Sequence, residues 1–174
     1  MNIYLLGYMG CGKTRTGRRL SAYAGRPFTD LDALFEQRHG LSIADYFQQH
    51  SEAAFRQEER QLLHETGRLK GHIIALGGGT PCFADNMAWI KGHGVSLYLE
   101  MNERMLFQRL SRSHKRRPLL AGMDPDQLLE QICRQLPQRE PYYRQADVTW
   151  PGLDVELPPL WQRLQTLLPT NASE

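Results

Sequence analysis

One glycine-rich stretch constrains the fold more strongly than any other: Gly7-Tyr8-Met9-Gly10-Cys11-Gly12-Lys13-Thr14. It matches the phosphate-binding loop pattern G-x-x-x-x-G-K-[ST] at every fixed position. Glycines in such a loop let backbone N–H groups turn inward around an anion, and the helix that follows adds its positive dipole. Lys13 is placed to reach the β- and γ-phosphates of a nucleotide, and the Thr14 hydroxyl to hold Mg²⁺. The stretch therefore predicts a nucleotide site.

The residues around this loop supply the strand and the helix that the motif requires. Residues 3–6 are a short apolar run of strand formers, and residues 14–24 read as a helix. Further strands are expected at 28–32, 72–76, 95–99 and 148–150, with helices at 33–38, 43–49, 52–66, 85–91, 103–111, 125–135 and 157–168. This alternation predicts an α/β fold with a parallel sheet, whose ligands lie at the carboxyl ends of the strands.

Composition narrows the class of protein. A chain of 174 residues suits one domain, and a net charge of +2 does not point to nucleic acid as a partner. The three cysteines contain no C-x-x-C pair, which favours a reducing compartment over a disulfide framework. No apolar run approaches the roughly 20 residues that span a bilayer, and none near the N-terminus resembles a signal peptide. We therefore expect a cytoplasmic protein with small-molecule partners, and no nucleic acid or membrane partner.

Two carboxylates follow the second expected strand, in Phe28-Thr29-Asp30-Leu31-Asp32. Residues two apart on a strand face the same side, so both aspartates would turn toward the phosphate loop. One would hold Mg²⁺, through water, and the other would accept a hydrogen bond from an acceptor hydroxyl. Alternatively, either aspartate caps the helix expected from Ala33 onward.

A run of glycines and three arginines are further candidates. Gly77-Gly78-Gly79 follows the third strand and permits close approach of a ligand, although a flexible turn has the same composition. Arg56 and Arg139 would bind carboxylate or phosphate groups, or instead form surface ion pairs and turns. Arg117 lies in a basic segment that suits either a lid over phosphates or a solvated loop. Cys11 is either an oxidisable thiol or, as we favour, a small residue that fills a tight turn.

In this order, the motifs resemble those of shikimate kinase, a family in the nucleoside-monophosphate-kinase-like fold group. The phosphate loop is common to many kinases, whereas the combination with the other motifs is much more specific. The resemblance covers nearly the whole chain and rests on Gly7 to Thr14, residues 28–32, Phe55-Arg56, Gly77-Gly78-Gly79, Arg117-Pro118-Leu119-Leu120 and Arg139 with Pro141-Tyr142-Tyr143.

The resemblance implies a three-layer fold with a five-stranded parallel sheet in the order 2-3-1-4-5. It implies one domain at residues 1–174, with an acceptor-binding helical region at about 32–62 and a mobile lid at about 111–124. The implied reaction, with Mg²⁺ as cofactor, transfers the γ-phosphoryl group of ATP to the 3-hydroxyl of shikimate, on the route to chorismate and aromatic amino acids. ATP and shikimate would be the partners of a monomer.

The resemblance also implies roles on the donor side. The implied nucleotide-binding residues are Gly10, Cys11, Gly12, Lys13, Thr14, Arg15, Arg109 and Arg117. Thr14 would hold Mg²⁺, with Asp30 supporting it through water, and Arg117 would reach the phosphates from the lid. Arg109 and residues 148–153 would border adenine. Arg15 departs from the family, which more often has a small hydroxyl residue there, so it either adds a phosphate contact or faces solvent.

On the acceptor side, the resemblance implies that Asp32 binds the hydroxyls of shikimate and is a candidate base. Lys13, Asp32 and Arg117 are the implied catalytic residues. Arg56 and Arg139 would clamp the carboxylate, and the backbone of Gly77, Gly78 and Gly79 would touch the ring.

Two alternatives remain open from the sequence. The first is another kinase of this fold, with gluconate or a nucleoside monophosphate as acceptor. A nucleobase acceptor would require a stacking aromatic side chain, whereas Asp32, Arg56 and Arg139 suit a polyol that carries a carboxylate. The second is a regulatory nucleotide-binding protein without catalysis. That alternative predicts a missing metal ligand, acceptor residue or lid arginine, and Thr14, Asp32 and Arg117 are all present.

Overall fold

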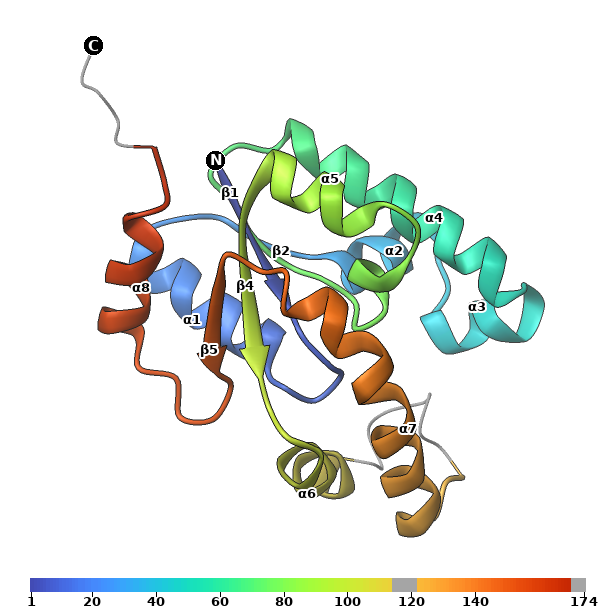
Figure 1. The fold of residues 1–174 in the computed structure, drawn as a ribbon. Helices are drawn as coiled ribbons and strands as arrows, with labels where there is room; N and C mark the ends of the chain where they lie inside the picture. The colour runs from blue at the N-terminus through green and yellow to red at the C-terminus, as the bar shows by residue number, and fades with distance from the viewer. Residues whose placement is uncertain (114–121, 170–174) are drawn as a thin grey trace.

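A five-stranded parallel sheet forms the centre of the molecule (Figure 1). The computed structural model describes residues 1–113 and 122–169, without the side chain of Ser113. The strands are β1 (Asn2–Leu6), β2 (Phe28–Asp30), β3 (Ile73–Ala75), β4 (Gly94–Glu100) and β5 (Val148–Pro151). Their order is β2-β3-β1-β4-β5, and every neighbouring pair is parallel. This confirms the predicted topology.

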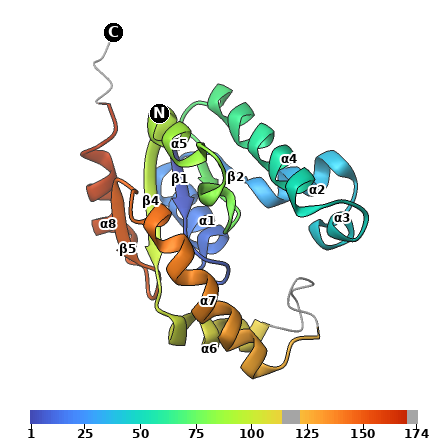
Figure 2. The same cartoon turned by 45° about the vertical axis from the view of Figure 1, so that its right-hand side comes forward.

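Helices cover both faces of the sheet. They are α1 (Lys13–Ala24), α2 (Leu31–His39), α3 (Ile43–Gln49), α4 (Glu52–Glu65), α5 (Asn86–His93), α6 (Glu103–Ser113), α7 (Pro125–Tyr143) and α8 (Leu157–Gln165). Figures 1 and 2 show α1 and α8 on one face and α5, with α4 beside it, on the other. The fold is therefore the α/β fold with a parallel sheet that the alternation of elements predicted, in the three layers that the resemblance implied.

The central strands are apolar because both faces are covered. Every residue of β1 and β3 is buried, which matches the continuous apolar runs that a parallel sheet requires. Tyr4 of β1 packs edge-on against Trp89 of α5, with ring centroids 6.0 Å apart. Tyr98 of β4 lies against Tyr143 of α7 at 5.2 Å. These contacts hold α5 and the end of α7 on the sheet.

The boundary between β2 and α2 differs from the prediction. The strand ends at Asp30, and the helix begins at Leu31, so Asp32 lies in the first helical turn and not on the strand. The Asp30 carboxylate caps this helix by accepting hydrogen bonds from the backbone N–H groups of Asp32 (3.1 Å) and Ala33 (3.4 Å). A cap satisfies N–H groups that have no partner within the helix, which explains the early start.

The boundary of α7 also differs. The sequence predicted an end near Gln135, but the helix continues to Tyr143 through Pro137 and Pro141. Proline normally interrupts a helix because it lacks an N–H group and crowds the preceding turn. Here, burial of Leu128, Ile132, Leu136 and Tyr143 on one side of α7 outweighs that penalty. The extension places Arg139 within a helix, where a surface turn was the alternative.

Other helix ends agree with the sequence signals. The side chains of Ser42, Ser51, Asn102 and Asp124 each accept a hydrogen bond from a backbone N–H three residues later. Asp124 and Gln127 form a complete capping box at the start of α7. Helix α8 ends at Gln165, a few residues before the predicted end.

Two regional predictions stay predictions. The acceptor-binding region expected at about 32–62 comprises α2, α3 and most of α4. Residues 114–121 of the expected lid lie outside the described residues. Among the described helices, none is long and apolar enough to cross a membrane.

Candidate active site

The phosphate loop joins β1 to α1 in a strongly curved conformation. Gly7, Gly10 and Gly12 have φ angles of 137°, 85° and 99°, a region that side chains with a Cβ rarely occupy. The Cys11 N–H donates to the Tyr8 carbonyl at 3.2 Å and closes the turn. Helix α1 begins at Lys13 directly after the loop, with Gly12 as its N-cap residue. Backbone donors and the start of a helix thus meet at one point, as an anion site requires.

Lys13 contacts the phosphate loop itself, whereas Thr14 contacts the end of β2. The Lys13 ammonium donates to the carbonyls of Gly7 (2.7 Å) and Tyr8 (3.2 Å). The Thr14 hydroxyl donates to Asp30 Oδ2 at 2.7 Å, while Oδ1 of the same carboxylate caps α2. The two interpretations of Asp30 are therefore compatible, because each carboxylate oxygen serves a different partner. The predicted pairing of the loop with a carboxylate from β2 is present.

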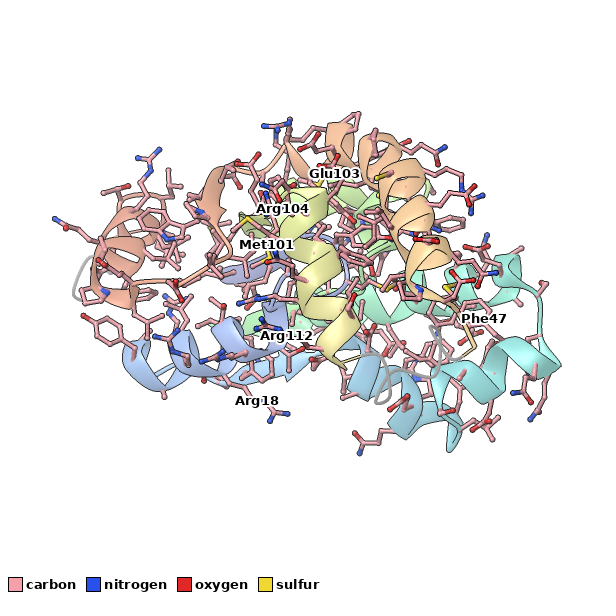
Figure 3. The ribbon with its side chains drawn as sticks, turned by 90° about the horizontal axis from the view of Figure 1, so that it is seen from below. Arg18, Phe47, Met101, Glu103, Arg104 and Arg112 are labelled. Atoms are coloured by element: carbon pink, nitrogen blue, oxygen red, sulfur yellow. The ribbon has the colours of Figure 1, made fainter. Side chains whose placement is uncertain are left out.

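Two cavities open at the carboxyl edge of the sheet. The phosphate cavity, about 590 Å³, is lined by Met9, Gly10, Gly12, Lys13, Thr14, Arg15, Arg18, Arg19, Asp30, Asp32, Leu76 and Gly78. The acceptor cavity, about 450 Å³, is lined by Met9, Asp32, Glu36, Ser42, Ile43, Ala44, Phe47, Glu52, Phe55, Arg56, Glu59, Gly77, Gly78, Gly79, Gln131, Gln135 and Arg139. Figure 3 looks onto this edge and labels one lining residue of each cavity, Arg18 on α1 and Phe47 on α3.

Asp32 borders both cavities, as do Met9 and Gly78. The aspartate reaches solvent through these openings, yet protein atoms surround its carboxylate closely enough to penalise the charged form. This desolvation, reinforced by the nearby charges of Asp30 and Glu59 and opposed by Lys13, raises the pKa of Asp32 to about 6. A carboxylate with a raised pKa at the junction of two cavities is typical of a functional site.

Arg56 reaches the acceptor cavity from α4. Its guanidinium donates to Glu59 Oε2 at 2.7 Å, and only 16% of its side chain is exposed. The i,i+3 ion pair considered from the sequence is therefore real, but it lies in a partly buried position and not on a solvated face. Arg56 keeps its place in the cavity wall because the ion pair is formed with a buried partner.

Arg139 reaches the same cavity from α7. Its guanidinium carbon lies 5.3 Å from the centre of the Tyr8 ring. Among the described residues, no carboxylate forms an ion pair with Arg139. The Arg139 cation lies on the Tyr8 ring and has no carboxylate partner among the described residues, so it is available to bind an anionic group of a ligand.

The triple glycine lies between the two arginines. A Cβ added at Gly78 would lie 3.4 Å from Arg139 Nη1, and one at Gly79 would lie 2.6 Å from the Arg56 guanidinium carbon. The Gly78 carbonyl accepts a hydrogen bond of 2.5 Å from the Tyr143 hydroxyl. The glycines therefore leave room for the arginine side chains as well as for a ligand.

Sequence reasoning assigned no role in the site to Glu59, Thr80 or Tyr143. Glu59 and Thr80 are buried and hydrogen-bonded to each other at 2.6 Å beside Arg56. The i,i+3 spacing of Arg56 and Glu59 indicated their ion pair, but it did not indicate that Glu59 would be buried. Tyr143 belonged to the motif that contains Arg139, but the sequence did not indicate what Tyr143 or Thr80 would contact, because the partners of both lie in distant segments.

The predicted adenine neighbours also come together. Arg109 of α6 donates to the carbonyls of Gly10 (3.4 Å) and Cys11 (3.1 Å). A small hollow of about 50 Å³ lies beside it and is lined by Gly12, Arg15, Thr16, Arg19, Arg109, Gly152, Asp154 and Val155. Gly152 is the residue of the predicted segment 148–153 that lines this hollow. Asp154 and Val155, just beyond the segment, also line it.

Of two further predicted residues, Cys11 is described by the structure and Arg117 is not. Cys11 is 1% exposed, and a Cβ at Gly7 would lie 2.8 Å from its Sγ, which supports its interpretation as a residue that fills the turn. Arg117 lies outside the described residues.

The fold and this site define a class of protein. A parallel sheet with a phosphate loop after β1, next to a cavity lined by several carboxylates and two arginines, is the architecture of a small-molecule kinase of the phosphate-binding-loop class.

Comparison with known proteins identifies the family within that class. Residues 9–152 match the family model of shikimate kinase. The shikimate kinase of Bacteroides fragilis is 40% identical over 147 residues, which is 84% of this chain and 82% of that protein. The chain therefore belongs to the shikimate kinase family, whose members are ATP-dependent kinases acting on an alcohol group.

Solved structures agree with this assignment. The crystal structure of shikimate kinase from Bacteroides thetaiotaomicron has a TM-score of 0.88 at 36% identity, and the match covers 96% of this chain and 97% of that one. The shikimate kinase of Acinetobacter baumannii, solved in complex with shikimate, has a TM-score of 0.81 at 35% identity and covers 99% and 95%. These matches favour shikimate kinase over the gluconate kinase, nucleoside monophosphate kinase and regulatory alternatives.

Proposed function

We propose that this protein transfers the γ-phosphoryl group of ATP to the 3-hydroxyl of shikimate, giving shikimate 3-phosphate and ADP, on the route to chorismate and aromatic amino acids. The observation that carries the proposal is the position of Asp32, which borders both the phosphate cavity and the acceptor cavity. Phosphoryl transfer depends mainly on positioning and charge stabilisation, so the two reactants must meet at such a junction.

On the donor side, the phosphates bind the backbone N–H groups from Gly10 to Thr14, and Lys13 neutralises their charge. Arg15 lies at the start of α1, lines both the phosphate cavity and the small hollow, and adds a contact to the phosphate chain. Arg109 lies against adenine beside Gly152. Arg117 approaches the phosphates from the lid.

The loop and β2 also provide a site for Mg²⁺. Thr14 Oγ1 and Asp30 Oδ2 lie 2.7 Å apart in a solvent-accessible position, and oxygen ligands of this kind fit a magnesium ion that keeps several waters. Thr14 would hold the ion and Asp30 would support it through water. When bound, Mg²⁺ neutralises charge on the phosphate oxygens.

On the acceptor side, Arg56 and Arg139 bind the carboxylate of shikimate, and the backbone of Gly77, Gly78 and Gly79 contacts the ring. Asp32 accepts a hydrogen bond from the 3-hydroxyl and directs its oxygen toward the phosphate cavity. Its pKa of about 6 also suits it to receive the hydroxyl proton as the new O–P bond forms.

The decisive experiment measures ADP release with MgATP and, in turn, shikimate, quinate, gluconate, AMP and CMP. We expect release with shikimate, and its loss in Lys13→Ala and Arg139→Ala, since each removes a charge that binds one substrate. Arg144→Ala is a matched control, because Arg144 follows α7 but pairs with Glu100 and Glu140 away from the cavity.

Release with another acceptor only would preserve the fold and the donor side but overturn the roles of Asp32, Arg56 and Arg139. Tight ATP binding without ADP release for any acceptor would instead support a regulatory protein.

The setting of the enzyme is also part of the proposal. Cys11, Cys82 and Cys133 are all unpaired, which supports a cytoplasmic location. Both cavities lie at one edge of a single sheet, which fits a single domain, and we propose that this domain acts as a monomer.

A further inference from the structure

A buried carboxylate lies behind the acceptor cavity. Glu59 is 2% exposed, its Oε2 accepts from Arg56 Nη1 at 2.7 Å, and its Oε1 accepts from the Thr80 hydroxyl at 2.6 Å. A carboxylate removed from water is stable only when charge and hydrogen bonds compensate its lost hydration. Among the described residues, each oxygen of Glu59 has one such partner, so removal of either leaves part of the charge uncompensated.

The backbone around Thr80 fixes the direction of its hydroxyl. The residue is fully buried, its N–H donates to the Gly77 carbonyl at 3.2 Å, and its own carbonyl accepts from Asn86 Nδ2 at 2.8 Å. A carboxylate oxygen can only accept, so the Thr80 hydroxyl must be the donor to Glu59. Thr80 therefore supplies a rigid donor, anchored to α5 through Asn86.

Gly77 and Gly79, which precede Thr80, leave room for Glu59, Thr80 and Arg56 because they carry no Cβ. A Cβ at Gly77 would lie 2.5 Å from Glu59 Oε1 and 2.9 Å from Thr80 Oγ1. At Gly79, it would collide with the Arg56 guanidinium. The absence of side chains at these positions lets the Thr80–Glu59–Arg56 chain lie directly against the floor of the cavity.

Arg56 depends on this chain for its orientation. Its other carboxylate partner, Glu52, is 72% exposed and 3.4 Å away, and an exposed pair of that length contributes little. The buried contact to Glu59 is shorter and shielded from solvent. Loss of the Thr80 donor would leave Glu59 Oε1 without this hydrogen bond. The carboxylate would then rotate or become protonated, and either change would weaken its ion pair with Arg56.

We propose that Thr80 is a positioning residue for the acceptor: its hydroxyl holds Glu59, and Glu59 holds Arg56 toward the ligand carboxylate. This role rests on the proposed function, because it takes shikimate as the ligand that Arg56 binds. Thr80 touches neither substrate in this scheme. Its effect on catalysis passes entirely through Glu59 and Arg56.

The test compares Thr80→Val with Thr80→Ser in the full-length protein. Valine keeps the branched shape but removes the donor, whereas serine keeps the donor. We expect Thr80→Val to raise the KM for shikimate about tenfold or more, since hydrogen bonds to charged groups are worth that much. The KM for ATP and the kcat should stay within about twofold of wild type, and Thr80→Ser should restore most of the shikimate affinity.

Thr66→Val is the matched control. Thr66 is also a buried threonine, with its hydroxyl donating to the Leu63 carbonyl at 2.6 Å, but it precedes β3 at the opposite edge of the sheet. Thermal unfolding of both variants measures the general cost of losing a buried hydroxyl. A purely structural role for Thr80 would make the two variants alike in KM.

A double-variant cycle tests the route through Glu59. Glu59→Gln should itself raise the shikimate KM, and adding Thr80→Val should change it little further, because both variants break one chain. Additive effects would overturn the proposal, as would an unchanged shikimate KM in Thr80→Val with normal wild-type turnover. Absence of shikimate-dependent ADP release in the wild type would instead overturn the proposed function and the Thr80 role with it.

Discussion

Asp32 combines an ionisable group with surroundings that oppose its ionisation. Desolvation comes first, followed by the negative charges of Asp30 and Glu59, and Lys13 only partly offsets them. The folded protein therefore binds this proton more tightly than the unfolded chain does. Such a residue lowers stability at neutral pH, which is a common property of functional groups.

The substitution Asp32→Asn should therefore stabilise the ligand-free protein at about pH 7.5, by an amount on the order of 1 kcal/mol after allowance for solvent screening. The pKa of Asp32 is raised from 3.8 to about 6, so the wild type loses stability as the pH rises through that window. The advantage of the variant should grow through the same window and be small at about pH 4. Urea unfolding at both pH values measures it.

Asp45→Asn is the control, because Asp45 is an exposed carboxylate at the start of α3. An Asp32→Asn variant that is less stable than wild type at neutral pH would contradict the predicted sign.

Between elements, the phosphate loop is tied to α7 through Tyr8. The Tyr8 hydroxyl donates to Gln135 Oε1 at 2.8 Å, its ring lies under Arg139, and its carbonyl accepts from Lys13. One loop residue therefore contacts both the lysine of the donor side and the arginine of the acceptor side. The length of α7 makes this possible, since an end near Gln135 would not have carried Arg139 to the cavity.

Two substitutions separate the hydroxyl of Tyr8 from its ring. Tyr8→Phe keeps the ring but loses the hydroxyl and its bond to Gln135, and should raise the shikimate KM by about threefold or less. Tyr8→Leu also removes the aromatic surface under Arg139 and should raise it about tenfold, because a partly buried cation–π contact is worth about 1 kcal/mol or more. Steady-state kinetics with shikimate as the varied substrate measures both.

Tyr23→Leu provides a comparison on α1, where Tyr23 is 51% exposed. Equal shikimate KM values for Tyr8→Leu and wild type would show that the ring does not support Arg139.

Across the whole molecule, the nucleotide site joins segments from both ends of the chain. The loop after β1, helix α6 and the turn after β5 all contribute to it. A ligand that binds only the assembled site stabilises the entire fold by mass action.

ADP at about 100 times its Kd should therefore raise the free energy of unfolding by about 2.7 kcal/mol. Lys13→Ala should lose most of this gain at the same ADP concentration, while Lys91→Ala, an exposed lysine on α5, should retain it. Thermal unfolding with and without ADP measures the difference. A full ADP response in Lys13→Ala would contradict the role of Lys13 in phosphate binding.

The sequence alone determined much of this protein. The resemblance to shikimate kinase assigned Arg56 and Arg139 to the acceptor site, and both line the acceptor cavity. The phosphate loop, the alternation of strands with helices and the positions of Asp30 and Gly77 at the ends of strands predicted the class of fold and the segments that meet at its carboxyl edge. These features were readable because each is local: a loop pattern, a cap or a run of apolar residues expresses its preference within a few positions.

The tertiary structure decided the rest. It extended α7 through two prolines, placed Asp32 on a helix and buried Glu59 between Arg56 and Thr80. Each of these depends on contacts between segments far apart in the chain, where burial outweighs local preference or changes the environment of a charge. Local sequence patterns do not carry that information, because the partner of each group is set only when the chain has folded.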